Sequence, residues 1–485
     1  MQIRFVKAVG EFRLELTYVH LVTLAITLIV VIGCGIYSAR TVKSAEGYSL
    51  GGRSSGVTLI AGSIAGTVIG GGATVGTAQM AYLFGFSAWW FTLGSGIGFI
   101  LMGLFYARPL RTSGLETIPQ YLVLNYGKMA GPLASVIASI GILFSAVASC
   151  LPGIQIIAAI FGVVPWQAAI IIVVLVGAYV FFGGMKGAGV SGLLKLIIIW
   201  VTLFVAGGTA LLALKDMANF NMTFPAYPWF SLFGNGLWAG LGNLFSLIVG
   251  IICTQTYIQA IFSASDSRTA AIGAFAAALV VIPVGLPSIA VAMFMHAVQP
   301  DILPILVLPS YLLQYQPEWL GGIGLAGILL SLIGSIAGLA LGIGTMVSKD
   351  LCYELFNIRT SKTVLWINRF TIIMVTVIAS LIAILNLKSQ VLVWNYMSMA
   401  LRGGGVFLPL TMAIFAPGRL TPIWAVTSMV VSTVAAIIAA LVLKLPIDPL
   451  FVGIIVSAAI ILIGLMQRRE NVAMSEGVKE QNIDT

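Results

Sequence analysis

Charged side chains are scarce in this sequence. Only 8% of its 485 residues are Asp, Glu, Lys or Arg, whereas 60% are hydrophobic. The mean hydropathy of +1.08 is typical of a chain that lies largely within a lipid bilayer. Four cysteines are present, and their spacing is not that of metal ligands. These shortages exclude a water-soluble domain and a disulfide scaffold.

Acidic residues are missing from the middle of every long apolar run, since all fifteen Asp and Glu lie in loops, tails or at the edges of the runs. The two histidines, His20 and His296, lie near the ends of runs, where snorkelling or capping explains them. An enzyme within the bilayer needs acid–base or metal groups that meet there. We therefore expect no enzyme, no catalytic residue and no organic cofactor.

Long apolar runs, by contrast, are abundant. Windows of about 20 apolar residues predict an all-α integral membrane protein with about 13 transmembrane helices. We expect one transmembrane domain over residues 1–467 and a disordered cytoplasmic tail over residues 468–485. The predicted spans are 17–38, 57–83, 87–106, 130–160, 165–183, 189–213, 231–260, 270–297, 320–346, 363–386, 391–415, 421–443 and 448–467.

Basic residues gather on alternate loops between these runs. Loops rich in Lys and Arg stay on the cytoplasmic side of a membrane. This pattern predicts an outside N-terminus and a cytoplasmic C-terminus in the cell membrane, and it accounts for the net charge of +9 without a nucleic-acid partner. The basic clusters are Arg40, Lys43 and Arg53; Arg108, Arg111 and Lys128; and Arg468 and Arg469.

Glycine interrupts the second apolar run. Between Gly62 and Gly85 there are seven glycines, three of them consecutive at Gly70–Gly72. Each glycine destabilises a helix interior by about 1 kcal/mol relative to alanine. A broken helix frees backbone carbonyls at mid-bilayer, which is tolerated where they line a cavity or bind an ion. The run is therefore typical of the binding helix of a transporter.

Several short motifs occur in order along the chain and together resemble the sodium:solute symporter family over residues 18 to 467. The resemblance implies an inverted repeat of the LeuT type, with one extra helix before and two after the repeats. Repeat one would span about 57–213 and repeat two about 231–415, each beginning with a broken helix. The motifs are Gly51-Gly-Arg-Ser54, Arg108-Pro-Leu-Arg111, Thr117-Ile-Pro-Gln-Tyr-Leu122, Gly183-Gly184, Gln255-Thr-Tyr-Ile-Gln259, Pro309 with Gly321–Ser331, and Ser348-Lys-Asp350.

The resemblance also implies a Na⁺ site with ligands from two helices. The matching positions are Gly66 and Ile69 for the carbonyl donors, and Ser331, Gly334 and Ser335 for the hydroxyl donors. Ser331 and Ser335 share one helix face, and their oxygens suit a hard cation. The alternative is that these small residues only let helices pack closely. Gly334 departs from the family, which usually has a hydroxyl at this position.

A second departure follows the Gly183-Gly184 hairpin. Where the family commonly has an acid and a glutamine, this chain has Ser191, Gly192 and Lys195. A buried lysine without a counter-charge costs a few kcal/mol in the bilayer. Two interpretations remain open. Lys195 either snorkels to the inner surface, or its amine takes the sodium position and exchanges the coupling proton.

The substrate pocket is less clearly marked. Arg402 lies within a predicted span, before three glycines, where a guanidinium can bind a carboxylate or be satisfied by loosened carbonyls. The other candidates are Gly70, Gln79, Asn243 and Gln255. No aromatic residue occurs in the last turns before Gln255, which disfavours stacking on a sugar. A small organic anion or amino acid is therefore the expected solute.

These features predict a secondary active transporter that imports a small organic solute by alternating access, coupled to Na⁺ by the family default. A proton-coupled or uncoupled transporter using Lys195 is the first alternative. A membrane sensor module acting with a separate signalling partner is the second, because the tail is too short for a signalling domain. Solute and lipid bilayer are the expected partners.

Overall fold

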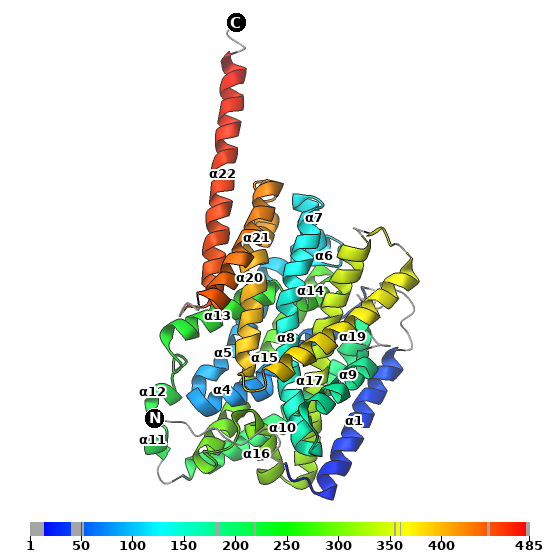
Figure 1. Ribbon diagram of the computed structural model, residues 1–485, viewed down its shortest axis with the longest axis vertical. Coiled ribbons are helices and arrows are strands. Elements are labelled where there is room, and N and C mark those ends of the chain that lie inside the picture. Colours follow the sequence, from blue (N-terminus) through cyan, green and yellow to red (C-terminus); the bar gives the residue numbers. More distant parts are fainter. Residues whose placement is uncertain are drawn as a thin grey trace.

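The computed structural model describes residues 14–39, 50, 53–180, 184–217, 220–353, 356–358, 360–443 and 447–481. Within these residues every regular element is a helix, apart from an isolated bridge between Ser55 and Ala264. The long helices pack into one bundle, with α6, α7 and α14 at one end and α11, α12 and α16 at the other (Figure 1). The expected all-α class is confirmed.

The longer helices are α1 (Tyr18–Ala39), α8 (Ala130–Phe161), α9 (Pro165–Val180), α10 (Gly184–Lys215), α13 (Leu237–Ile252), α15 (Ser267–Val298), α17 (Glu318–Met346), α19 (Ser361–Leu385), α20 (Val391–Phe415), α21 (Pro422–Ile437) and α22 (Pro449–Gln481). The shorter ones are α3 (Val57–Val68), α4 (Thr77–Phe84), α5 (Trp90–Leu101), α6 (Ala107–Thr112), α7 (Ile118–Tyr126), α11 (Phe220–Thr223), α12 (Ala226–Trp229), α14 (Gln255–Phe262) and α16 (Val307–Tyr315). Short π-helical segments form η1 (Gly72–Gly76), η3 (Met102–Tyr106), η5 (Val347–Tyr353) and η6 (Ile438–Val442), and short 3₁₀-helices form η2 (Gly85–Trp89) and η4 (Pro304–Leu306).

Nine helices in the described part of the chain are long and apolar enough to cross a membrane, or ten if the bent pair α13 and α14 is one span. Shorter apolar helices lie at Tyr18–Val31, Val57–Val68 and Pro165–Tyr179. Within the described residues each predicted span lies largely on helix, but the predicted count of about 13 crossings is not confirmed. The break after Val68 leaves α3 with 12 residues, which is too short to cross a bilayer alone.

Both helix breaks that the sequence predicted are present. The first lies between α3 and η1, where Ile69 leaves the helical conformation (φ −77°, ψ 74°) ahead of the Gly70–Gly72 triplet. The second separates α13 from α14, which are bent by 41°. At this break the Thr254 hydroxyl donates to the carbonyl of Gly250 at 2.6 Å, which offers the backbone an alternative to continued helix.

Helix α17 forms the centre of the bundle. An apolar 18-residue stretch within Glu318–Cys352 has 94% of its residues buried inside the protein. The helix packs against α1, α3, α8, α10 and α19. Its glycines allow close approach: Gly338 faces the Thr67 side chain of α3, and Gly342 faces Thr256 of α14. The central helix therefore contacts both broken spans, and this arrangement positions the candidate site.

Helix α22 corrects the expectation for the tail. Instead of ending near residue 467, it continues as helix to Gln481 and projects from the bundle (Figure 1). Residues 468–481 contain no proline, and nine of these fourteen residues are Glu, Arg, Lys, Ala, Met or Gln, which favour helix. At its other end, Asp448 accepts hydrogen bonds from the Leu450 amide (2.9 Å) and the Ser246 hydroxyl (3.0 Å), which tie α22 to α13.

Candidate functional site

Two serine hydroxyls of α17 meet the broken end of α3. Ser331 donates to the carbonyl of Ile69, and Ser335 donates to the carbonyl of Thr67. Ser331 is 0% exposed and Ser335 is 4% exposed. The break makes these contacts possible, because a continuous helix would use both carbonyls in its own ladder.

Of the two carbonyls expected to bind the cation, that of Ile69 accepts from Ser331, and Ser335 donates to Thr67, the residue after the other expected position, Gly66. A Cβ placed on Gly66 would lie 3.1 Å from the Cα of Gly192 in α10. Gly70 lies against the Ser335 side chain. The three-residue spacing that points Gly66 and Ile69 the same way in a helix is lost where α3 unwinds.

Lys195 reaches the same place from α10. It is 1% exposed, and its Nζ donates to the carbonyl of Ser331 at 3.3 Å. A Cβ on Gly334 would lie 2.6 Å from this nitrogen and 3.2 Å from the hydroxyl of Tyr179. The ammonium group therefore lies inside the bundle in this structure and does not extend to the surface.

The resulting cluster has one chemical character: hard oxygen donors beside one amine. Hydroxyls and main-chain carbonyls bind small hard cations, and they also accept hydrogen bonds from an ammonium group. Gly334 supplies no hydroxyl, and the volume that a side chain would occupy there is taken by Lys195 Nζ. The cluster thus suits either a small cation or the lysine charge.

Two predicted substrate residues contact the ends of neighbouring helices. The Gln79 amide oxygen accepts from the Val391 amide at 2.9 Å, at the start of α20. Gln255 binds the beginning of α7 through its side chain, accepting from the Ile118 amide and donating to the Glu116 carbonyl, each at 2.9 Å. Asn243 lies on α13 and is 8% exposed. Among the described residues, no hydrogen bond joins these three residues to one another.

Arg402 is completely buried on α20. Its Nη2 donates to the Ser145 hydroxyl of α8 at 3.3 Å and contacts the Met399 sulfur at 2.8 Å. Its Nε and Nη1 have no hydrogen-bond partner. Helix α20 continues unbroken through Gly403–Gly405, so these residues do not leave main-chain carbonyls free for the guanidinium. The partners of Arg402 are the Ser145 and Met399 side chains, and the interpretation that backbone carbonyls satisfy it is therefore wrong.

Sequence reasoning missed two polar residues near the first break. Asn395 Nδ2 and the Tyr396 hydroxyl are buried without a partner. A Cβ on Gly72 would lie 2.8 Å from Asn395 Nδ2, and the Tyr396 ring meets the Phe91 ring edge-on at 6.3 Å. The signal was available, because Asn-Tyr is a polar pair inside a predicted apolar span.

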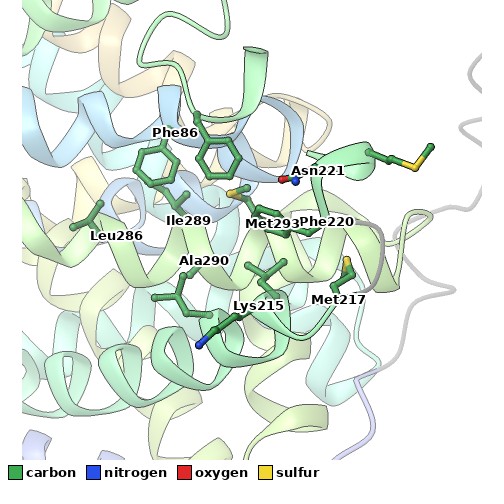
Figure 2. A pocket seen from close by; sticks show the side chains of 13 residues that line it. Phe86, Lys215, Met217, Phe220, Asn221, Leu286, Ile289, Ala290 and Met293 are labelled. Atoms are coloured by element: carbon green, nitrogen blue, oxygen red, sulfur yellow. The ribbon is translucent and has the colours of Figure 1, made fainter. Parts of the chain in front are cut away.

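A separate cavity of about 780 Å³ lies between α10, α11, α15 and η2 (Figure 2). Phe86, Met293 and Asn221 face one another across it, whereas the Lys215 amine points away from them. Its lining is mostly apolar and includes no residue of α17 or of either helix break. This cavity is therefore distinct from the cluster around Lys195.

Known proteins resemble this chain over most of its length. The high affinity choline transporter 1 of Homo sapiens is 25% identical over 428 residues, which cover 83% of this chain and 73% of that protein. A sodium/proline symporter of Staphylococcus aureus (strain JH9) is 24% identical over 443 residues, which cover 87% and 85%. Both relatives are transporters by name.

Solved structures show the same fold. A Na⁺-coupled sialic acid symporter in a substrate-bound outward-open state gives a TM-score of 0.78 at 18% identity, covering 93% of this chain and 97% of that one. A nucleobase-cation-symport-1 family transporter in a closed conformation gives 0.59 at 11% identity, covering 87% and 93%. These likenesses and the two broken spans confirm the LeuT-type architecture.

The family profile described as the sodium:solute symporter family matches residues 48–432, which is most of the chain. Its match includes α3, α17 and the helices that carry Lys195 and Arg402. The chain belongs to the sodium:solute symporter family, and it is a multi-pass membrane transporter and not an enzyme.

Proposed function

We propose that the chain imports a small organic solute by alternating access and couples this movement to Na⁺. The observation that carries the proposal is the meeting of the Ser331 and Ser335 hydroxyls with the carbonyls of Ile69 and Thr67 at the broken end of α3. A helix break supplies carbonyls that a cation can use, and rearrangement of the break links cation binding to solute binding. The repeats would span about 57–213 and 231–415, and the basic loops would face the cytoplasm.

A second candidate function follows from Lys195. Its ammonium lies against Gly334 and donates to Ser331, so it occupies space beside the same oxygen donors. In this case the lysine charge replaces Na⁺, and transport is proton-coupled or uncoupled. The two functions predict opposite responses to sodium, because one binding volume does not hold both an ammonium group and a cation without strong repulsion.

The proposed solute is a small organic molecule, with an organic anion or amino acid as the expected class. Asn395 and Tyr396, beside the first break, offer unpartnered hydrogen-bonding groups for it. The relatives named for choline and proline show that solutes of different charge occur among similar chains. The solute class therefore has to be argued from this chain's own residues.

The thermal stability of the purified protein in detergent tests the coupling ion. A ligand that binds only the folded state raises the melting temperature with its concentration. Na⁺ should stabilise the protein relative to equal K⁺, and Ser335→Ala should need several-fold more Na⁺ for the same response. If Na⁺ has no effect while the stability changes with pH and Lys195→Gln removes that change, the lysine has replaced the ion.

A further inference from the structure

Arg402 has more hydrogen-bonding capacity than its surroundings use. It is the largest of the completely buried side chains in the described part of the chain. An arginine carries five N–H donors, and only Nη2 has partners here, a hydroxyl and a thioether sulfur. The single donor of Nε and the two of Nη1 are therefore unpaired.

The position of Arg402 is also unusual, because it lies next to the second helix break. The Cys253 thiol within the break and the Tyr257 hydroxyl at the start of α14 are both within electrostatic reach of the guanidinium. On the other side, Ser145 of α8 shares a 2.7 Å hydrogen bond with Ser398 of α20. The guanidinium thus lies between α8, α20 and the break between α13 and α14.

The surroundings of Arg402 offer hydroxyl, thiol and thioether groups but no carboxylate partner among the residues described. A buried guanidinium without a counter-charge costs several kcal/mol. Its planar fork matches a carboxylate through two parallel N–H···O bonds, which are stronger than bonds to neutral groups. The Met399 sulfur is a weak acceptor by comparison. The guanidinium therefore lacks a negatively charged partner in this site.

We infer that the transported solute carries a carboxylate, and that Arg402 binds this group between α8, α20 and the break that joins α13 to α14. This inference rests on the proposed function, since it names the class of the solute. The Ser145 hydroxyl positions Nη2. The carboxylate displaces the weak contact of Nη2 with Met399, and its two oxygens accept from the fork that the freed Nη2 donor forms with the unpaired Nε or Nη1. The rest of the solute then extends toward the first break, where Asn395 and Tyr396 have free polar groups.

The first experiment compares melting temperatures of the purified protein with matched solutes. Propionate, pyruvate, L-lactate and L-proline are the carboxylate probes, their neutral counterparts are propionamide, pyruvamide, lactamide and L-prolinamide, and choline is a cationic probe. At least one carboxylate should raise the melting temperature in a saturable way, and its amide should not. The assay is repeated with chloride replaced by methanesulfonate, which is not a carboxylate, to separate a solute carboxylate from an inorganic anion.

Variants test whether the carboxylate-dependent rise in melting temperature requires Arg402. Arg402→Met should be at least as stable as the unmodified protein without solute, because an uncompensated charge is removed, yet it should lose the carboxylate response. Arg402→Lys should weaken the response at least tenfold in concentration, since it keeps the charge but loses the fork. Arg111→Lys is the matched control: this arginine donates to the carbonyls of Ala264 and Ser265, and its substitution should leave the response unchanged.

Failure of this inference differs from failure of the proposed function. If only choline or a neutral solute stabilises the protein and enters proteoliposomes, transport stands and the carboxylate inference is wrong. A carboxylate response that persists in Arg402→Met also overturns it, as does a response that chloride reproduces in full. If no probe of any class shifts the melting temperature or is taken up, both the inference and the proposed import are contradicted.

Discussion

Lys195 Nζ lies where a side chain at position 334 would begin, 2.6 Å from the place of a Cβ on Gly334. The two residues belong to α10 and α17, which pack against each other, with Gly327 of α17 facing Ile198 and Ile199 of α10. A glycine at position 334 leaves the space that the Lys195 amine occupies, so the missing hydroxyl and the added amine affect the same small volume. Two departures from the family sequence meet at a single point.

Replacing Lys195 by Gln should make uptake insensitive to pH and increase its sensitivity to Na⁺. An ammonium about 4 Å from a sodium ion opposes its binding by about 1 to 4 kcal/mol, depending on the local dielectric. Removing the charge should lower the half-saturating Na⁺ concentration about tenfold or more. Uptake into proteoliposomes over a range of pH and Na⁺ measures both effects.

Lys215→Gln is the matched control, because Lys215 lies at the exposed end of the same helix. It should change neither response. Unaltered pH dependence in Lys195→Gln would show that Lys195 takes no part in coupling.

Gly334→Ser should destabilise the protein although it restores the family hydroxyl. The new Cβ would meet Lys195 Nζ at 2.6 Å, and overpacking of this kind costs about 1 to 3 kcal/mol. In a Lys195→Ala background most of this loss should disappear, and a Na⁺-dependent rise in melting temperature should become larger. A double-mutant cycle of thermal stability in detergent measures the coupling between the two positions.

Gly208→Ser on α10 serves as the comparison, since nothing lies within 4 Å of a Cβ there. It should not lower the melting temperature. Equal losses from Gly334→Ser with and without Lys195 would contradict the contact.

Ser335→Ala should weaken the junction between α17 and the broken end of α3. It removes the donor to the carbonyl of Thr67, and loss of such a hydrogen bond costs about 1 kcal/mol. If the hydroxyl also binds Na⁺, the half-saturating Na⁺ concentration should rise several-fold. Ser380→Ala removes a buried hydroxyl that donates to the Cys150 sulfur at 3.7 Å, and it should leave the Na⁺ response intact.

The stability of the junction between α13 and α22 should fall as pH rises through the weakly acidic range. Burial raises the pKa of Asp448 from 3.8 to about 6, although hydrogen bonds from Leu450 and Ser246 oppose this shift. Because the folded pKa is the higher one, the contribution is fully present below about pH 4 and is lost as pH rises through about 6. The loss amounts to about 1 to 3 kcal/mol.

Melting temperatures between pH 4 and pH 7 for the unmodified protein and for Asp448→Asn measure this effect. The amide keeps an oxygen that accepts from Ser246 and Leu450, so the variant should fold while this part of the pH dependence disappears. Identical pH profiles for the two proteins would refute the assignment to Asp448.

Local chemistry allowed a good part of this architecture to be predicted. The glycines at 70–72 indicated the first break, and the i, i+4 spacing of Ser331 and Ser335 indicated one polar face on a buried helix. Both features depend on short stretches of chain. The helical tail was not predicted, because polarity was read as disorder although the residues themselves favour helix.

The contacts between different helices were harder to predict from the sequence. The sequence did not indicate that the Ser335 hydroxyl donates to the carbonyl of Thr67. Nor did it indicate that the Gln255 side chain binds the start of α7, some 137 positions earlier in the chain. In neither case does the spacing of residues along one segment specify the partner on another.

The sequence by itself determined the membrane class, the broken helices and the types of groups available, because hydrophobicity and backbone preference act within one segment of chain. Tertiary structure decided that Lys195 is buried against Gly334 and that Arg402 has three unpaired donors beside the second break. Whether a charge reaches water or remains inside the bundle depends on how neighbouring helices pack, and that packing joins segments far apart in the chain.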